Sequence, residues 1–387
     1  MINLKKLLVI LLLIMVCSQY GTTNAQTVSP FKIAVFAPVY LDEAFNEGNY
    51  SLGNNNIPKQ ILPGLDFYNG VQLAIDSLQA EGQHLEILFF DLKSKKENID
   101  QIIQSGKLNN CSLLIASFNN RADIKPLADF AKSKQIPLIS ATYPNDAGIR
   151  SNPFFALVNP TLLTHIEGLF KYLQKNHPTE PILYIKKAGP LEDMIEQTFL
   201  ELNKKTPALP LKLKTISVSD SINISQYNSM LDSTRTNFIL CGTINEAFGI
   251  NLVKSVAANK PYKSVVLGMP TWDAIKDLGK GTEIIYSTPF NYNRTDKLLQ
   301  RISTQYRNKL QGRPSDMVFK GFESLYHFGR LLIKHQQKIA TQLSDNSFKI
   351  FNEYDFVPVQ QNGEINYLEN RKLYFVRKSD GIIKTVQ

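Results

Sequence analysis

The sequence has few cysteines, three among 387 residues. Cys17 falls in an apolar N-terminal segment, and Cys111 and Cys241 lie at the ends of two predicted strands in different halves of the chain. Strands in separate halves do not bring two side chains within the short reach of a disulfide. We therefore expect Cys111 and Cys241 to be buried, unpaired thiols, which behave as small apolar side chains.

Long apolar runs are also lacking. The longest, Leu7–Val16, has ten residues, which is too few to cross a bilayer. Lys5-Lys6 precedes this run and the small residues Thr23-Asn24-Ala25 follow it, which is the pattern of a cleaved secretory signal. We predict that residues 1–25 are removed and that the protein is periplasmic or secreted. The alternative is a lipoprotein anchored through Cys17.

Concentrated positive charge is missing as well. The formal net charge is +9, or +7 without the two lysines of residues 1–25, but Lys and Arg are dispersed through the chain. The sequence shows no basic stripe interleaved with aromatic residues. We therefore predict no nucleic-acid partner and attribute the charge to solubility.

The motifs of common enzymes and cofactor sites are absent too. The five histidines show no metal-ligand spacing, and Gly279-Lys280-Gly281 lacks the surroundings of a phosphate-binding loop. Ser324 and His327 lie three residues apart near Glu323, but no Gly-x-Ser-x-Gly elbow accompanies them. The neighbours Glu192-Asp193 would point apart on a helix, which disfavours an acid/base pair. We predict no catalytic residue, metal ion or cofactor, and a protein that is not an enzyme.

The sequence does contain a regular alternation of strands and helices. Short runs rich in β-branched and aromatic residues alternate with segments whose apolar residues recur every three or four positions. The first half is predicted to have strands at 31–37, 85–90, 113–116 and 136–139, and helices at 65–78 and 123–133. After Asn159-Pro160 the pattern restarts, with helices at 162–174, 191–204 and 246–258 and strands at 182–185, 237–241, 265–268 and 283–287. This order favours an α/β fold with parallel sheets.

The C-terminal region has a different pattern. Residues 297–335 have helical spacing throughout, whereas from Phe348 onward Asn362-Gly363 and Asp380-Gly381 separate alternating runs. Asn-Gly and Asp-Gly at such positions are typical of tight hairpin turns. We predict that antiparallel strands close the chain.

Two neighbouring predicted strands end in hydroxyl and amide side chains. The first is followed by Ser117-Phe118-Asn119-Asn120 and the second by Ser140-Ala141-Thr142-Tyr143. In open parallel sheets, ligands bind beyond the carboxyl ends of the strands. These two segments therefore predict a site for a small polar ligand.

Five segments, in their order along the chain, carry a resemblance to a known family. They are KIAVFAP (32–38), GLDFYNGVQLAIDSL (64–78), ILFFDLKSKKENI (87–99), LLIASFNNRADIKPLADFAKSKQIPLISATYPN (113–145) and YRNKLQGRPSDMVFKGFESLYHFGRLL (306–332). With these segments the chain resembles the type I periplasmic solute-binding proteins, especially those that bind branched-chain amino acids. The resemblance extends from about Phe31 to the end of the chain.

This resemblance implies two doubly wound, parallel-sheet lobes joined by a three-strand hinge, with the ligand between the lobes. Each lobe would consist of two segments, 26–157 and 293–340 for lobe one, 158–292 and 341–387 for lobe two. The chain would cross between the lobes near 156–160, 287–292 and 340–351. Closure around a small-molecule ligand would present a surface to a membrane permease or sensor. Receptors of this family usually work as monomers.

In the family, the ligand contacts come from loops at the strand ends. The corresponding residues of lobe one are Ser117, Asn119, Asn120, Ser140, Ala141, Thr142 and Tyr143. The corresponding segments of lobe two are Lys187–Asp193, Thr243–Glu246 and Met269–Asp273, with Thr243, Glu246, Trp272 and Asp273 as the expected contacts. In amino-acid binders, lobe one holds the ligand carboxylate, and an acid of lobe two holds the ammonium.

Two segments depart from the amino-acid-binding pattern and, together with an insertion, leave two functions open. Lys186–Pro190 (KKAGP) lacks the usual pair of an acid followed by an aromatic residue. Gly268–Asp273 (GMPTWD) stands where amino-acid binders have Gly-Pro-Glu, and Trp272 would either stack on the ligand or pack between the lobes. An Asn-rich insertion, Tyr40–Pro63, follows the first strand. The first function is a receptor that captures a small polar ligand for uptake or sensing. The second is a cell-envelope scaffold or regulator that binds a protein or cell-wall material.

Overall fold

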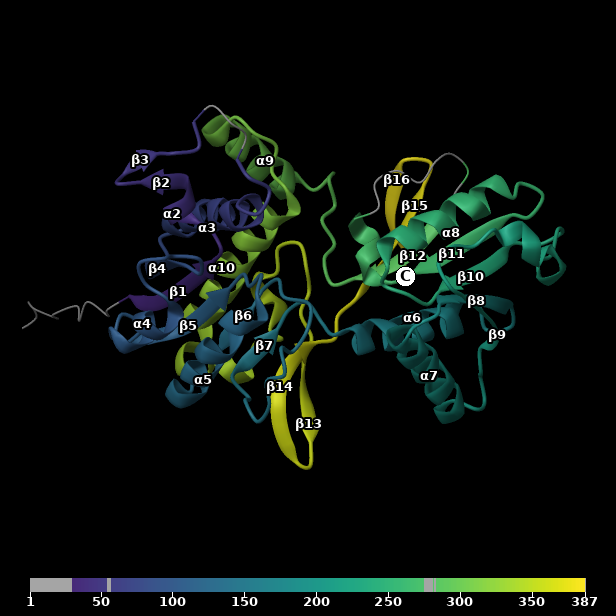
Figure 1. Cartoon of the computed structure of the whole chain (residues 1–387). Coiled ribbons are helices and arrows are strands. Elements are labelled where there is room, and N and C mark those ends of the chain that lie inside the picture. Colours follow the sequence, from purple (N-terminus) through teal and green to yellow (C-terminus); the bar gives the residue numbers. More distant parts are fainter. Residues whose placement is uncertain (1–29, 54–56, 275–280, 282, 387) are drawn as a thin grey trace, which may run out of the picture.

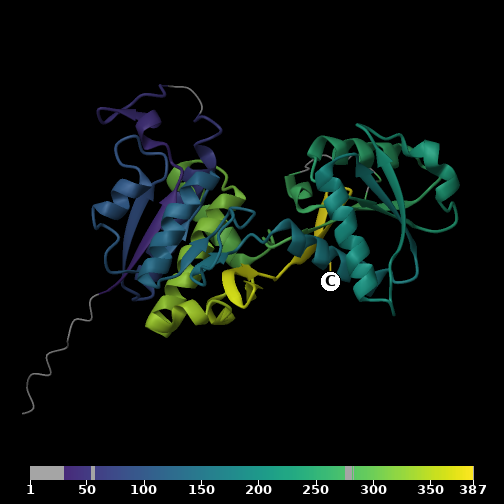
Figure 2. The ribbon, with the colours of Figure 1, turned by 60° about the horizontal axis from the view of Figure 1, so that its bottom comes forward.

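The chain folds into two α/β lobes joined by three crossings (Figure 1). The computed structural model describes residues 30–53, 57–274, 281 and 283–386. The predicted signal peptide with Cys17 lies outside these residues. In a second view the lobes again lie side by side and only thin segments connect them (Figure 2). The predicted α/β class with two parallel-dominated sheets is confirmed.

Lobe one is built on a seven-stranded sheet of order β13-β14-β7-β6-β5-β1-β4. Its strands are β1 (Phe31–Ala37), β4 (Leu85–Asp91), β5 (Cys111–Ala116), β6 (Leu138–Ser140), β7 (Phe155–Leu157), β13 (Phe356–Gln361) and β14 (Glu364–Asn370). Its helices are α2 (Leu41–Ala44), α3 (Leu62–Ala80), α4 (Ile99–Gln104), α5 (Ile124–Lys134), α9 (Lys297–Leu310) and α10 (Asp316–His335), with 3₁₀ turns η1 (Arg121–Asp123), η4 (Gln336–Thr341) and η5 (Asn346–Phe348). All neighbouring strands of this sheet are parallel except β13 and β14.

Lobe two is built on a second seven-stranded sheet, of order β16-β15-β12-β11-β10-β8-β9. Its strands are β8 (Pro181–Lys187), β9 (Lys212–Val218), β10 (Asn237–Cys241), β11 (Ser264–Gly268), β12 (Glu283–Thr288), β15 (Tyr374–Ser379) and β16 (Ile382–Val386). Its helices are α6 (Leu162–Asn176), α7 (Pro190–Lys205) and α8 (Glu246–Ala258), with 3₁₀ turns η2 (Ile224–Met230) and η3 (Pro270–Ala274). The five strands from β12 to β9 are parallel, and β15 and β16 are antiparallel additions at the edge.

Each sheet is buried on both faces, which is why its strands are apolar at successive positions. In β1, Ile33 and Val35 point to the core beneath α3, α9 and α10, whereas Ala34 and Phe36 point to the core beneath α4 and α5. Lobe two likewise has one core beneath α8 and another beneath α6 and α7. Cys111 and Cys241 are buried, unpaired thiols in different lobes, as predicted. Among the described helices, none is both long and apolar enough to cross a membrane.

The predicted helical region 297–335 consists of two helices. Helix α9 ends where Gln311 adopts a left-handed backbone conformation with φ 55°, and Pro314 then prevents the helix from continuing. Ser315 starts α10 by accepting the backbone N–H of Met317 on its side chain. The helical spacing of apolar residues therefore continues across the break between α9 and α10. Only the segment Gly312–Ser315 indicates this break in the sequence.

The predicted C-terminal hairpins are confirmed. Strand β13 pairs with β14 and β15 with β16, each pair antiparallel. The turn residues Asn362-Gly363 and Asp380-Gly381 all have positive φ, between 48° and 82°. Both central residues of a type I′ turn need positive φ, which Asn, Asp and Gly adopt most easily.

The expected lobe assignment of 341–387 needs correction. Strand β14 pairs in parallel with β7, with Leu368 opposite Ala156, so residues 341–370 belong to lobe one. Only β15 and β16 belong to lobe two. The third crossing is therefore 371–373, not 340–351. The other two crossings are 158–161, between β7 and α6, and 289–296, between β12 and α9.

Candidate ligand-binding site

The carboxyl ends of both parallel sheets lie on the side of each lobe where the chain crosses. Strand β7 is parallel to β6, β5, β1 and β4, and the chain leaves lobe one from the carboxyl end of β7. Strand β12 is parallel to β11, β10, β8 and β9, and the chain leaves lobe two from the carboxyl end of β12. Loops at these strand ends are therefore next to the hinge, the position where open α/β sheets bind ligands.

Two predicted residues of lobe one meet at adjacent strand ends. Ser117 follows β5 and Thr142 lies two residues beyond β6, and their hydroxyl oxygens are 3.2 Å apart. The Thr142 hydroxyl also lies 3.3 Å from the Phe118 carbonyl, to which it can donate. Ser117 is buried and Thr142 is half-buried. This pair of hydroxyls can donate to and accept from a polar ligand.

The predicted amides are on the exposed side of the same edge. Asn119 donates from Nδ2 to the Tyr40 hydroxyl at 3.0 Å, and Tyr40 itself has a left-handed backbone conformation with φ 56°. Asn120 accepts the backbone N–H of Ala122 and thereby starts η1. Asn119 thus contacts the loop after β1, whereas the side chain of Asn120 caps η1.

Asp91, at the end of β4, organises the loop after β1 and was not among the predicted residues. Its carboxylate accepts the backbone N–H groups of Val39 at 2.9 Å, Tyr40 at 3.1 Å and Leu41 at 2.8 Å. It also accepts the N–H of Lys93 at 2.9 Å. Hydrogen bonds to a charged acceptor are stronger than neutral ones, so Asp91 fixes the position of Tyr40. The sequence signal is an acid directly after the apolar run 87–90.

Three further predicted residues of lobe one are less accessible. Ser140 and Ala141 are buried, and Ala141 donates its N–H to the Ala116 carbonyl within the sheet. The Ser140 hydroxyl has no hydrogen-bond partner among the described residues. Tyr143 is half-buried and packs against the core beneath α4 and α5.

Lobe two presents a buried acid, Glu192, within the expected contact segment. Glu192, in the first turn of α7, is 8% exposed and accepts the Thr243 hydroxyl at 2.6 Å. Thr243 follows β10 and also accepts the Asn245 N–H. Glu246 is exposed at the start of α8. The structure thus joins Thr243 to Glu192, an acid within the expected Lys187–Asp193 segment.

A second charged cluster fixes the start of α7. The Lys186 ammonium lies 2.6 Å from an Asp193 oxygen and 2.5 Å from a Glu196 oxygen. Lys186 is 7% exposed, and burial by itself would lower its pKa, but the hydrogen bonds to Asp193 and Glu196 together raise it. This pairing compensates the buried ammonium and leaves Glu192 free of a cationic partner among the described residues.

The structure places Trp272 in the core of lobe two. Its side chain is 0% exposed and belongs to the core beneath α8. A Cβ atom at Gly268 would lie 2.1 Å from the indole ring and one at Gly249 2.8 Å, so these glycines make the space for it. Its expected stacking role therefore does not hold in this conformation. The side chain of Asp273 lies outside the described part of the chain.

Neither Ser/His pair forms an accessible catalytic arrangement. His327 has no hydrogen-bond partner on either ring nitrogen among the described residues, so it does not hydrogen-bond to Ser324. His165 Nδ1 lies 2.9 Å from Ser287 Oγ, but both side chains are buried between α6 and β12. Within the described residues, no group of three or more His, Cys, Asp or Glu is placed to hold a metal ion.

Comparison with known proteins identifies the fold. No family model and no curated protein matches the chain. Solved structures do match, among them a protein of Rhodospirillum rubrum described as a branched-chain amino acid ABC transporter (TM-score 0.64, 11% identity, 92% of this chain and 100% of that chain). A branched-chain amino acid ABC transporter periplasmic ligand-binding protein of Burkholderia xenovorans gives TM-score 0.59 at 13% identity, covering 92% and 94%.

A third match is an ABC transporter substrate-binding protein of Desulfitobacterium hafniense in complex with leucine (TM-score 0.55, 14% identity, 92% and 100% covered). These structures share one architecture over nearly the whole chain. The protein therefore has the type I periplasmic binding protein fold, as the sequence resemblance predicted.

Proposed function

We propose that this protein is an exported solute-binding protein, not an enzyme, which captures a small polar ligand between its lobes for uptake or sensing. The observation that carries the proposal is the pairing of Ser117 with Thr142 at two adjacent strand ends of lobe one. The structural neighbours support it, because two are named as branched-chain amino acid ABC transporter proteins and a third, an ABC transporter substrate-binding protein, is in complex with leucine. A membrane permease or sensor would be the partner, and the protein would act as a monomer.

The ligand chemistry that fits the two edges best is a zwitterion. In lobe one, the hydroxyls of Ser117 and Thr142 would hold a carboxylate. In lobe two, the buried carboxylate of Glu192 would hold an ammonium while it keeps the Thr243 hydroxyl. Glu192 would thus replace the acid that Trp272 displaces from the expected position. Contacts to both lobes would favour the closed state.

A thermal-shift screen tests this proposal with a panel of amino acids, short peptides, cell-wall fragments, sugars and nucleobases. A ligand present at about one hundred times its dissociation constant should add roughly 2.7 kcal/mol to the free energy of unfolding. We expect Thr142→Ala and Glu192→Gln to abolish the shift of an amino-acid ligand. Thr304→Ala, an exposed threonine on α9, should keep it. A hit that survives both cleft substitutions would contradict the proposed site.

A scaffold that binds a protein or cell-wall material is the second candidate. The insertion supports it, because its hairpin of β2 (Phe45–Asn46) and β3 (Asn49–Tyr50) exposes two aromatic rings. Phe45 is 45% and Tyr50 49% exposed, and their rings form an edge-to-face pair. Exposed aromatic pairs are common at interaction surfaces. No thermal shift with any small molecule of the panel would favour this candidate.

A further inference from the structure

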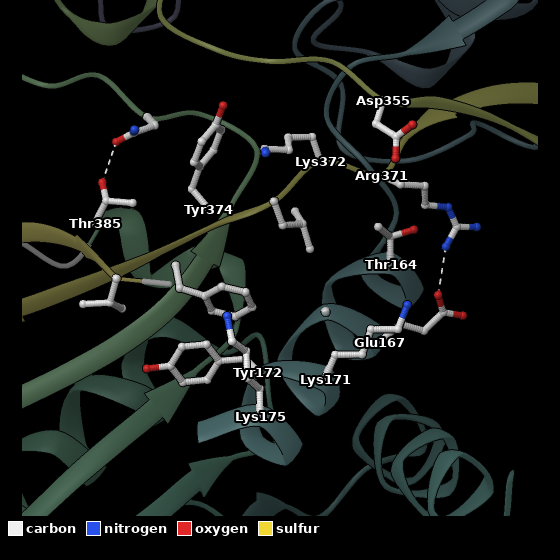
Figure 3. Close-up of a pocket in the computed structure, with 15 residues that line it drawn as sticks. Thr164, Glu167, Lys171, Tyr172, Lys175, Asp355, Arg371, Lys372, Tyr374 and Thr385 are labelled. Atoms are coloured by element: carbon white, nitrogen blue, oxygen red, sulfur yellow. Dashed lines mark hydrogen bonds and ion pairs between the residues drawn. The ribbon is translucent and has the colours of Figure 1, made fainter. Parts of the chain in front are cut away.

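A second hollow lies at the hinge, on α6 and the third crossing. Its volume is about 860 Å³, within the range of small-molecule sites. Side chains of α6, of residues 371–375 and of β16 line it, together with Asn291 from the second crossing (Figure 3). None of its lining residues belongs to the strand-end site described above.

The hollow contains two cations without a counter-ion. Lys171 and Lys175 lie four residues apart, on one face of α6, and both are exposed. Among the described residues neither has an ion-pair or hydrogen-bond partner. The other two cations of the hollow are satisfied: Arg371 pairs with Glu167 at 2.9 Å, and Lys372 pairs with Glu353 at 2.7 Å. Two like charges at this spacing repel each other, so an anion between them would be favourable.

A buried hydroxyl without a partner lies in the same hollow. Thr164 is 3% exposed, and its Oγ1 has no hydrogen-bond partner in the described part of the chain. Figure 3 shows Thr164 beside the Arg371–Glu167 pair. Buried polar groups nearly always have a partner, so an unpaired hydroxyl in a hollow indicates a place for a ligand oxygen.

The hollow also has an apolar wall, and one acid lies at its far end. Leu373, Phe375 and Val386 line the hollow, and the Phe375 ring stacks on Tyr172 at 4.4 Å. Asp355 is the one lining carboxylate besides Glu167, and Figure 3 shows it at the end away from Lys175. The anionic part of a ligand would therefore bind next to the two lysines, with an apolar part against this wall.

We propose that the hinge hollow binds a small organic anion. Its carboxylate or phosphate would be held by Lys171, Lys175 and the Thr164 hydroxyl, and its apolar group would contact Leu373 and Phe375. Asn291 and residues 371–373 belong to two crossings, which must shift when the lobes close. Binding here is therefore coupled to closure, and through closure to the ligand of the interlobe site.

Isothermal titration of the purified protein with phenyl phosphate and with phenylacetate tests this proposal. We expect binding of at least one of them at millimolar concentration, and none of the neutral analogue phenol. The double variant Lys171→Ala/Lys175→Ala should raise the dissociation constant about tenfold or more. Lys204→Ala/Lys205→Ala on α7 removes the same charge from exposed positions outside the hollow and should change nothing. Thr164→Val should weaken binding while it keeps the side-chain shape.

The outcomes separate this site from the interlobe site. Binding that persists in Thr142→Ala and weakens in the Lys171/Lys175 double variant supports the hinge hollow, whatever the interlobe ligand is. Absence of binding by both probes overturns the proposal. Equal affinity of the two lysine double variants overturns it too, because the anion would then bind through net charge alone. Loss of binding in Thr142→Ala would place the probe between the lobes.

Discussion

Burial shifts the pKa values of side chains held inside each lobe, in opposite directions for bases and acids. Burial lowers the pKa of His165 to about 3, where its Nδ1 faces Ser287. Burial raises the pKa of Glu323 to about 7, although its carboxylate accepts the N–H groups of Phe351 and Asn352. The cause is the same, because a low-dielectric surrounding disfavours the charged form of either group.

The pKa of His165 makes stability depend on pH. Its folded value of about 3 is below the ordinary 6.5, so the unfolded chain binds more protons between these values. The stability that neutral His165 contributes is complete above pH 6.5 and is lost as the pH falls towards 3. His165→Asn keeps a hydrogen-bonding group for Ser287 but does not titrate. Below pH 6.5, the free energy of unfolding of this variant should fall less steeply with pH than that of wild type. The two slopes should differ by about 1.4 kcal/mol per pH unit.

Denaturant unfolding at neutral and mildly acidic pH measures this slope. His84→Asn is the matched control, since it replaces an exposed histidine. An equal slope in wild type and His165→Asn would show that His165 is not the group that titrates.

Asp91 provides a second test at the residue scale. Asp91→Asn removes the charge that four backbone N–H groups share and turns one acceptor into a donor. We expect a loss of about 2 kcal/mol in the free energy of unfolding, measured from the urea midpoint. Asp129→Asn breaks an exposed ion pair with Lys125 and should cost less than about 0.5 kcal/mol. Similar costs for the two variants would contradict the role of Asp91.

At the scale of elements, local sequence patterns predicted the features that depend on neighbouring residues, namely the positions of strands, helices and turns. Apolar periodicity located the strands and helices, and Asn362-Gly363 located a hairpin because its backbone conformation is a property of those two residues. The partner of that hairpin was not predictable in this way. Strand β14 pairs with β7, more than two hundred residues earlier, and β14 itself reads like any edge strand. Segment 341–370 was therefore assigned to the wrong lobe.

The candidate site was predictable to a similar extent. Ser117 and Thr142 were recognisable because parallel strands bring their carboxyl ends to one edge. Trp272 was not, because its burial depends on the space left by Gly249 on α8 and Gly268 on β11. A glycine makes this space because it has no side chain, and its effect on a residue elsewhere in the chain gives no periodic pattern in the sequence. An isolated tryptophan after a strand therefore suggests a stacking platform and a core residue equally well.

The packing of α3 against α10 gives a prediction at this scale. A Cβ atom at Gly321 would lie 2.1 Å from the Phe67 carbonyl oxygen, and one at Gly70 2.0 Å from the Val318 carbonyl oxygen. Alanine usually stabilises a helix relative to glycine, by about 1 kcal/mol. Gly321→Ala should instead lower the free energy of unfolding by about 2 kcal/mol or more, because the two backbones must separate.

Gly329→Ala on the same helix is the control. Its new Cβ would meet only the ends of side chains, Leu85 at 3.0 Å, Ile33 at 3.7 Å and Leu78 at 3.9 Å. Its stability should stay within about 1 kcal/mol of wild type in urea unfolding. Equal effects at Gly321 and Gly329 would mean that helix propensity, not close packing, decides the outcome.

For the whole molecule, the separation of the cores matters most. Each lobe has its own sheet and its own two cores, and hydrogen bonds at the crossings tie the lobes together. Among these, Glu353 of lobe one donates its N–H to the Tyr374 hydroxyl of β15 at 2.8 Å. Asn291 of the second crossing hydrogen-bonds to both Asn352 of lobe one, at 2.6 Å, and Thr385 of β16, at 2.7 Å. Polar contacts of this kind can be kept while the lobes rotate, which a shared apolar core would prevent.

Separate cores predict separate unfolding of the two lobes, and the single tryptophan can report it. Trp272 is buried in lobe two, so its fluorescence follows that lobe alone. Leu325→Ala in lobe one and Leu252→Ala in lobe two make the same change at fully buried positions, each at a cost of about 2–5 kcal/mol to its own lobe. In urea unfolding, Leu252→Ala should lower the fluorescence midpoint, and Leu325→Ala should leave it in place while the circular dichroism midpoint falls. If Leu325→Ala lowers both midpoints equally, the crossings couple the lobes into one unit that unfolds cooperatively. Lobe closure would then be a motion of two lobes that are not stable independently of each other.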